Sequence, residues 1–184
     1  MPSVEFLFDY ASPWSFLAES ILARRLPGAT IVHRPVYLRG FPAFATGIPY
    51  SSAKLLYVVK DLERCSAHEG VPIRIPSRFP INGLHALRGA LAAMAKGTFP
   101  AYHEAMFRAA WQEDRDISDR QVVADIARAH GVDEIDAPAI KQQLRADTEA
   151  AAARGVFGVP TFFVGDEMFW GHDRLDFVAR ALAR

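Results

Sequence analysis

Residues 3–15 have the sequence SVEFLFDYASPWS, an apolar run that leads through a polar turn to a serine and a proline. Residues 3–9 are rich in β-forming side chains that alternate in part, which predicts a β-strand. Ser12 is a favoured N-cap residue, and Pro13 is favoured at the first helical position. The chain should therefore pass from a strand directly into a helix at Ser12.

The residues that follow complete a strand–helix–strand unit. From Trp14 to Leu22 the apolar residues have helical spacing, and Pro27-Gly28 ends that helix. Residues 30–36 are again rich in β-formers and predict a second strand.

Between residues 39 and 154 the patterns are almost all helical. Gly70 and Gly97 are predicted helix stops, and Ser118 with Gln121 has the spacing of a capping box. The predicted helices span 51–69, 82–96, 102–112, a segment starting at 118, and 137–154.

The strand pattern returns near the end of the chain. Residues 161–164 and 168–170 flank Gly165-Asp166-Glu167, which predicts a hairpin, and residues 173–183 form an amphipathic helix. The order predicts an α/β fold in which an all-helical domain, residues 39–154, is inserted into a four-stranded domain made of 1–38 plus 155–184.

The composition excludes several classes of protein. Lys+Arg and Asp+Glu both number 21 among the 184 residues, so no basic surplus indicates nucleic acid or an anionic membrane. Cys65 is the sole cysteine, so neither an intramolecular disulfide nor a CxxC or zinc cluster is possible, and no metal is expected. Without a leader pattern or a membrane-length apolar run, we expect a cytoplasmic protein.

Three short motifs could carry chemistry, and each also has a structural interpretation. Ser12 could donate to an anion such as a thiolate at a helix start, or merely cap that helix. Val159-Pro160 could be a cis bond that exposes backbone to a ligand, or simply begin a strand. Asp173 could bind an ammonium, or cap the last helix.

A polar stripe on the helix 51–69 is a further candidate. Lys54, Tyr57, Asp61 and Arg64 are spaced to share one face, although ion pairing on a solvated face is the safer interpretation for Asp61 and Arg64. Cys65 has no activating neighbours in the sequence and is expected to be structural.

The motifs in their order resemble those of the 2-hydroxychromene-2-carboxylate isomerases and kappa-class glutathione transferases. The matching segments are Phe8-Asp9-Tyr10, Ser12-Pro13-Trp14-Ser15, Arg34-Pro35-Val36, Gly70-Val71-Pro72, Gly155-Val156-Phe157-Gly158, Val159-Pro160-Thr161 and Gly171-His172-Asp173-Arg174. The resemblance covers nearly the whole chain and implies the DsbA-like branch of the thioredoxin fold, glutathione as cofactor and a homodimer.

The resemblance also implies roles for individual residues. Ser12 takes the place of the first redox cysteine, where it would bind and activate the glutathione thiol, and Ser15 that of the second. The other implied glutathione contacts are Lys54, Val159, Pro160, Gly171, His172 and Asp173, and the implied substrate contacts are Lys54, Arg39 and Asn82. At position 172 the family usually has Ser or Asn.

The implied activity is cis–trans isomerisation of a small aromatic carboxylate in the degradation of naphthalene-like compounds. Two alternatives stay open: a kappa-like transferase that conjugates electrophiles, and a non-catalytic binding module. Thiol–disulfide exchange is nearly excluded because positions 12 and 15 are serines.

Overall fold

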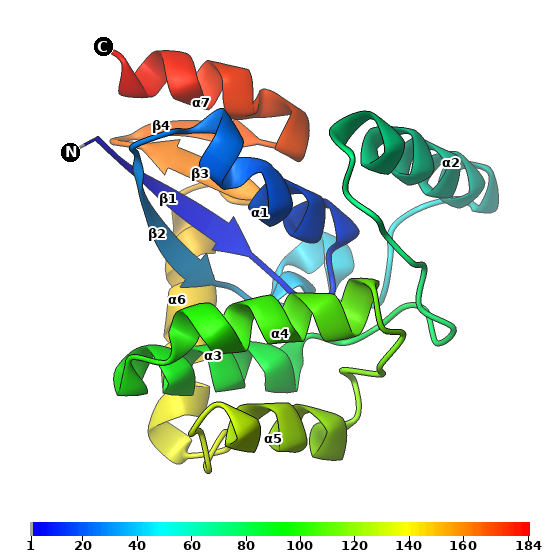
Figure 1. Ribbon diagram of the computed structural model, residues 1–184, viewed down its shortest axis with the longest axis vertical. Helices are drawn as coiled ribbons and strands as arrows, with labels where there is room; N and C mark the ends of the chain where they lie inside the picture. Colours follow the sequence, from blue (N-terminus) through cyan, green and yellow to red (C-terminus); the bar gives the residue numbers. More distant parts are fainter. Residues whose placement is uncertain (1) are drawn as a thin grey trace.

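The computed structural model describes residues 2–184. A four-stranded sheet has the order β2-β1-β3-β4 and is built from the two ends of the chain (Figure 1). β1 runs parallel to β2 and antiparallel to β3, and β3 pairs antiparallel with β4. The four strands are β1 (Ser3–Phe8), β2 (Thr30–Pro35), β3 (Thr161–Val164) and β4 (Glu167–Trp170).

Helices α2 to α6 lie between β2 and β3 in the sequence, so the predicted helical insertion in a thioredoxin-like sheet is confirmed. The helices are α1 (Pro13–Arg25), α2 (Ser52–Glu69), α3 (Leu84–Lys96), α4 (Phe99–Trp111), α5 (Arg120–Ala129), α6 (Pro138–Ala153) and α7 (Leu175–Leu182), with short 3₁₀ turns at Leu38–Gly40, Pro42–Phe44 and His172–Arg174.

The two faces of the sheet have separate cores because successive strand side chains point in opposite directions. Phe6 and Phe8 on β1 belong to the larger core, which includes residues of α1, α3, α4 and α7. Leu7, between them, packs in a smaller core with Phe163 and with Ala151 of α6. Both cores contain residues from the insertion, and the domain boundaries at 38/39 and 154/155 remain a prediction.

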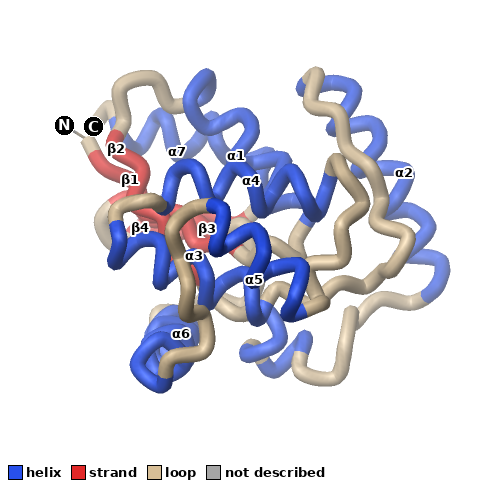
Figure 2. Tube along the Cα trace, turned by 60° about the horizontal axis from the view of Figure 1, so that its bottom comes forward, coloured by secondary structure: helices blue, strands red, loops and turns tan. Residues whose placement is uncertain are grey.

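Helix α2 differs from the other inserted helices because it lies at the margin of the molecule in both views (Figures 1 and 2). Leu62 and Ser66 are its buried residues, whereas Leu56 and Tyr57 are exposed. Among residues 2–184, no helix combines the length and apolar character needed to cross a bilayer.

Several predicted helix starts need correction. α3 begins at Leu84 rather than 82, and α4 at Phe99 rather than 102, because Pro100 is tolerated in a first helical turn. The predicted capping box at Ser118 is wrong: Asp119 caps α5 by accepting from the backbone N–H of Gln121. The Ser118 hydroxyl instead accepts from the backbone N–H of Asn82, which ties the segment before α5 to the loop before α3.

Candidate active site

A cavity of about 370 Å³ opens where β1 ends, α1 begins and the loop before β3 passes close by. This volume lies within the usual range for small-molecule pockets, roughly 300–1,000 Å³. Its wall combines both ends of the chain with the insertion; the main contributing segments are 9–14, 37–39, 47–50, 79–83, 158–160 and 170–174.

Ser12 lies buried at the cavity wall and caps α1, as predicted. Its Oγ accepts from the backbone N–H of Ser15 at 3.2 Å and donates to the carbonyl oxygen of Val159 at 3.4 Å. The second bond is long for a hydroxyl donor, whose usual O···O distance is about 2.7–2.8 Å. The hydroxyl proton can therefore turn toward an anion in the cavity at the cost of only a weak hydrogen bond to Val159.

The loop before β3 brings Val159 against Ser12. The Val159–Pro160 bond is cis, as the functional interpretation of this motif requires, and both residues line the cavity. The carbonyl oxygen of Pro160 accepts from the backbone N–H of Gly171 at 3.0 Å, so the loop is joined to the segment before α7. A second cis bond, Phe79–Pro80, also lies in the cavity lining and was not predicted.

The structural alternative for Asp173, an N-cap of the last helix, is wrong, because a 3₁₀ turn over His172–Arg174 precedes α7. The Asp173 carboxylate instead lies 3.3 Å from the Arg174 guanidinium, and its side chain is 54% exposed. Asp173 and Gly171 both line the cavity, so the expected ammonium contact is geometrically available on its rim.

His172 has a structural partner that the sequence did not reveal. Its ring stacks on the indole of Trp14, with centroids 4.8 Å apart and planes at 13°. Burial lowers the pKa of His172, which favours the neutral imidazole. The stack connects the start of α1 to the segment before α7, and both rings line the cavity.

Asp9 is a buried carboxylate in the cavity wall. In the sequence it stood out only within the matching segment Phe8-Asp9-Tyr10, and no role in the site was predicted for it. It accepts backbone hydrogen bonds from Ala11 at 2.9 Å and from Leu38 at 2.8 Å. Burial raises its pKa from 3.8 to about 6, against the opposing effect of these two bonds and of the Arg39 charge. Gly83 is required beside it, because an added Cβ would lie 1.9 Å from the Asp9 Oδ1.

The three predicted substrate contacts have different positions. Arg39 and Asn82 line the cavity from separate loops. Lys54 is exposed and is not among the lining residues; its Nζ lies 4.3 Å from the ring centroid of Tyr50, which does line the cavity. Its contact with glutathione or substrate remains a prediction.

The face that α2 turns toward the cavity shares only Asp61 with the predicted stripe of Lys54, Tyr57, Asp61 and Arg64. Leu55, Val58 and Asp61 line the cavity at intervals of three residues. Lys54 and Tyr57 precede two of these by one residue, which is about 100° around the helix. Asp61, which the sequence suggested was merely solvated, is therefore part of the cavity wall.

Aromatic side chains from separate segments make much of the remaining wall. They come from a 3₁₀ turn, the loop before α2, the loop before α3 and β4: Phe44, Tyr50, Phe79 and Trp170. Trp170 is 48% exposed, which places an open aromatic surface at the cavity. No local motif marks these residues, since only the fold brings them together.

Cys65 lies outside the cavity lining, and burial raises the pKa of its thiol above the ordinary value. A thiol with a raised pKa is a poor nucleophile. With serines at positions 12 and 15, the cavity offers a hydroxyl where thiol–disulfide exchange requires a cysteine.

A family model described as a DSBA-like thioredoxin domain matches residues 3–183. The chain belongs to the DSBA-like thioredoxin family. Among its curated relatives is the 2-hydroxychromene-2-carboxylate isomerase of Sphingobium xenophagum, 32% identical over 96% of this chain and 95% of the relative. The human glutathione S-transferase kappa 1 is 29% identical over 98% of this chain and 90% of its own length.

A solved structure shows the same likeness in three dimensions. A 2-hydroxychromene-2-carboxylate isomerase superposes with a TM-score of 0.83 at 32% sequence identity, covering 99% of this chain and 95% of the other. The fold and the full-length match agree with the resemblance that the sequence motifs indicated.

Proposed function

We propose that this DSBA-like thioredoxin protein is a glutathione-dependent isomerase of 2-hydroxychromene-2-carboxylate type. The observation that carries the proposal is the buried Ser12 hydroxyl, which lies at the cavity wall at the start of α1 beside the Val159 backbone. A hydroxyl at a helix N-terminus suits stabilisation of a thiolate, because the donor and the helix dipole both favour negative charge.

The cavity lining offers a partner for several parts of glutathione. Ser12 would face the sulfur, and the Val159 backbone would pair with the cysteinyl unit. The carboxylate of Asp173 would hold the γ-glutamyl ammonium, with the backbone of Gly171 and the stacked His172 beside it. The long Ser12–Val159 bond supports this fit, since its proton is free to change partner.

The rest of the cavity suits a small aromatic carboxylate. The rings of Phe44, Tyr50, Phe79 and Trp170 offer a flat apolar surface for an aromatic substrate. Arg39, a cationic side chain in the cavity lining, can hold a carboxylate, and Asn82 can add a neutral hydrogen bond.

The mechanism follows from these positions. When bound, glutathione supplies a thiolate whose reversible addition to a conjugated chain permits rotation about the former double bond. Ser12 donates to the sulfur and keeps it ionised, with help from the start of α1. Arg39 fixes the substrate carboxylate, and the aromatic wall excludes water from the reacting carbons. The Ser12 oxygen is a donor here, because no His–Asp pair contacts it to remove its proton.

The ultraviolet absorbance of bound thiolate against pH tests the role of Ser12. Ser12→Ala should raise the pKa of the bound thiol and lower the isomerisation rate by about 10²–10³, as for the loss of one donor to an anion. Ser15→Ala is the matched control, because this buried hydroxyl lies in the same helical turn and does not line the cavity. Identical titration curves for wild type and Ser12→Ala would show that Ser12 only caps α1.

A kappa-like transferase is the second candidate, supported by the full-length likeness to the human kappa enzyme. The two activities differ in the fate of glutathione, which an isomerase returns unchanged and a transferase consumes. Mass spectrometry of the products with 2-hydroxychromene-2-carboxylate and with a model electrophile separates them. A protein that binds glutathione and turns over neither compound would be the binding module.

A further inference from the structure

We infer a second site, a binding site for a borderline divalent metal ion of the Zn²⁺ class, formed by Glu19, His33 and His103. These side chains come from α1, β2 and α4, and their donor atoms all lie within 4.8 Å of one another. None of the three lines the cavity that contains Ser12. The sequence predicted no metal site, because its ligands are far apart in the chain.

The spacing of the donor atoms suits a tetrahedral ion. Glu19 Oε2 lies 2.9 Å from His33 Nε2 and 3.3 Å from His103 Nε2. Ligands about 2.0–2.1 Å from a tetrahedral Zn²⁺ are separated by about 3.3 Å, so both distances already approach the required geometry. Two imidazoles and one carboxylate leave a fourth position for water.

His103 supplies the observation that points to a ligand. Its ring is buried, and its Nε2 makes no hydrogen bond although a Glu19 oxygen lies near it. The Tyr10 hydroxyl lies 2.8 Å from His103 Nδ1. With a metal ion on Nε2, the Nδ1–H of His103 would donate to the Tyr10 hydroxyl, which would hold the ring in the orientation that the ion needs.

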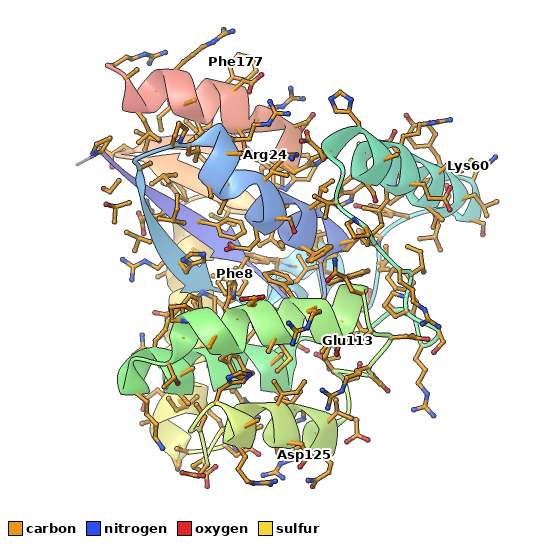
Figure 3. All side chains as sticks on the ribbon, in the orientation of Figure 1. Phe8, Arg24, Lys60, Glu113, Asp125 and Phe177 are labelled. Carbon is orange, nitrogen blue, oxygen red and sulfur yellow. The ribbon has the colours of Figure 1, made fainter. Side chains whose placement is uncertain are left out.

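The surroundings also resemble those of bound metals. Phe8, labelled in Figure 3, and Phe99 pack on the His103 ring with centroids 4.7 and 4.6 Å away, which gives the cluster an apolar shell. The side chains of Glu19 and His33 are 27% and 19% exposed, so an ion can enter from solvent. The His33–Glu19 ion pair is complete without a metal, whereas His103 Nε2 lies near Glu19 without hydrogen-bond geometry.

Calorimetry with ZnCl₂ on the full-length protein, after treatment with a chelator, tests the inference. We expect saturable binding of a single Zn²⁺ per chain. Replacing any one ligand should weaken Zn²⁺ binding by more than about 100-fold, because the loss of a residue that only hydrogen-bonds to a metal ligand already lowers metal affinity by about 10–100-fold. The three variants are Glu19→Gln, His33→Gln and His103→Gln. Tyr10→Phe should weaken Zn²⁺ binding by about 10-fold.

His68→Gln is the matched control, because this histidine is exposed on α2 and outside the cluster. If the buried variant His103→Gln does not fold, the partly exposed Glu19→Gln and His33→Gln still decide the question. Absence of Zn²⁺ binding to the wild type, or binding equally tight in the cluster variants, overturns the inference.

Discussion

Asp9→Asn should change how the stability of the protein depends on pH. The pKa of Asp9 in the folded protein is raised from 3.8 to about 6, because burial of the carboxylate outweighs its two backbone hydrogen bonds and the Arg39 charge. The folded state therefore holds the Asp9 proton to a higher pH than the unfolded state does. The tighter proton binding of the folded state stabilises the protein below about pH 4, and this stabilisation is lost as the pH rises through about 6.

The magnitude follows from the two pKa values. One pKa unit corresponds to about 1.4 kcal/mol, so the difference between 3.8 and about 6 is worth about 3 kcal/mol in full. At pH 4 the Asp9 carboxyl of the unfolded chain is already partly ionised. About 2 kcal/mol of the full difference in unfolding free energy is therefore lost between about pH 4 and pH 7.5. Asn cannot ionise, so the variant should gain that amount relative to the wild type across this interval.

Urea unfolding of both proteins at several pH values measures this difference directly. The absolute stability of the variant is less informative, because the Asn amide cannot accept from the N–H groups of both Ala11 and Leu38, as the carboxylate does. Asp166→Asn, at the exposed turn between β3 and β4, controls for the lost charge. A stability difference between wild type and Asp9→Asn that stays constant with pH would refute the reasoning.

Three further predictions concern the walls of the cavity. Gly83→Ala should destabilise the fold by about 1–3 kcal/mol, because the added Cβ would displace the Asp9 carboxylate. Thermal unfolding measures this loss of stability, and an unchanged melting midpoint would contradict the prediction. Trp14→Ala should weaken glutathione binding in calorimetry by about 3- to 10-fold through loss of the His172 stack, with Trp14→Phe much closer to wild type. Asp173→Asn should weaken glutathione binding only about 2- to 5-fold, because the Asp173 carboxylate is half exposed. A loss of affinity beyond about 100-fold would show that bound glutathione buries this carboxylate.

The sequence predicted the parts of the fold that depend on local chemistry. Ser12 caps α1 as its residue type and the following proline indicate, and Gly70 and Gly97 end their helices in the left-handed conformation. Asp119 rather than Ser118 caps α5, because a tertiary bond from Asn82 occupies the Ser118 hydroxyl. Local propensity cannot anticipate such a competition.

The candidate site was only partly predictable for the same reason. Ser12 and Val159, which the resemblance named as glutathione contacts, both line the cavity, and their contact with glutathione remains a prediction. The orientation of α2 depends on its packing, so the face that lines the cavity is that of Leu55 and not that of Lys54. Contacts between residues distant in sequence, such as the stack of Trp14 on His172, have no local signature.

The position of β3 in the sheet has a consequence for the protein during its synthesis. β3 begins at Thr161 and pairs with β1, whereas β2 ends at Pro35, so about 125 residues are made between the two neighbours of β1. At about 5–20 residues per second, a ribosome needs roughly 6–25 s to supply the missing strand. During that interval one edge of β1, with its apolar side chains, has no strand to cover it, and such edges invite pairing with other chains. While its helical insertion is being translated, the nascent chain therefore carries a β1 edge whose partner strand does not yet exist.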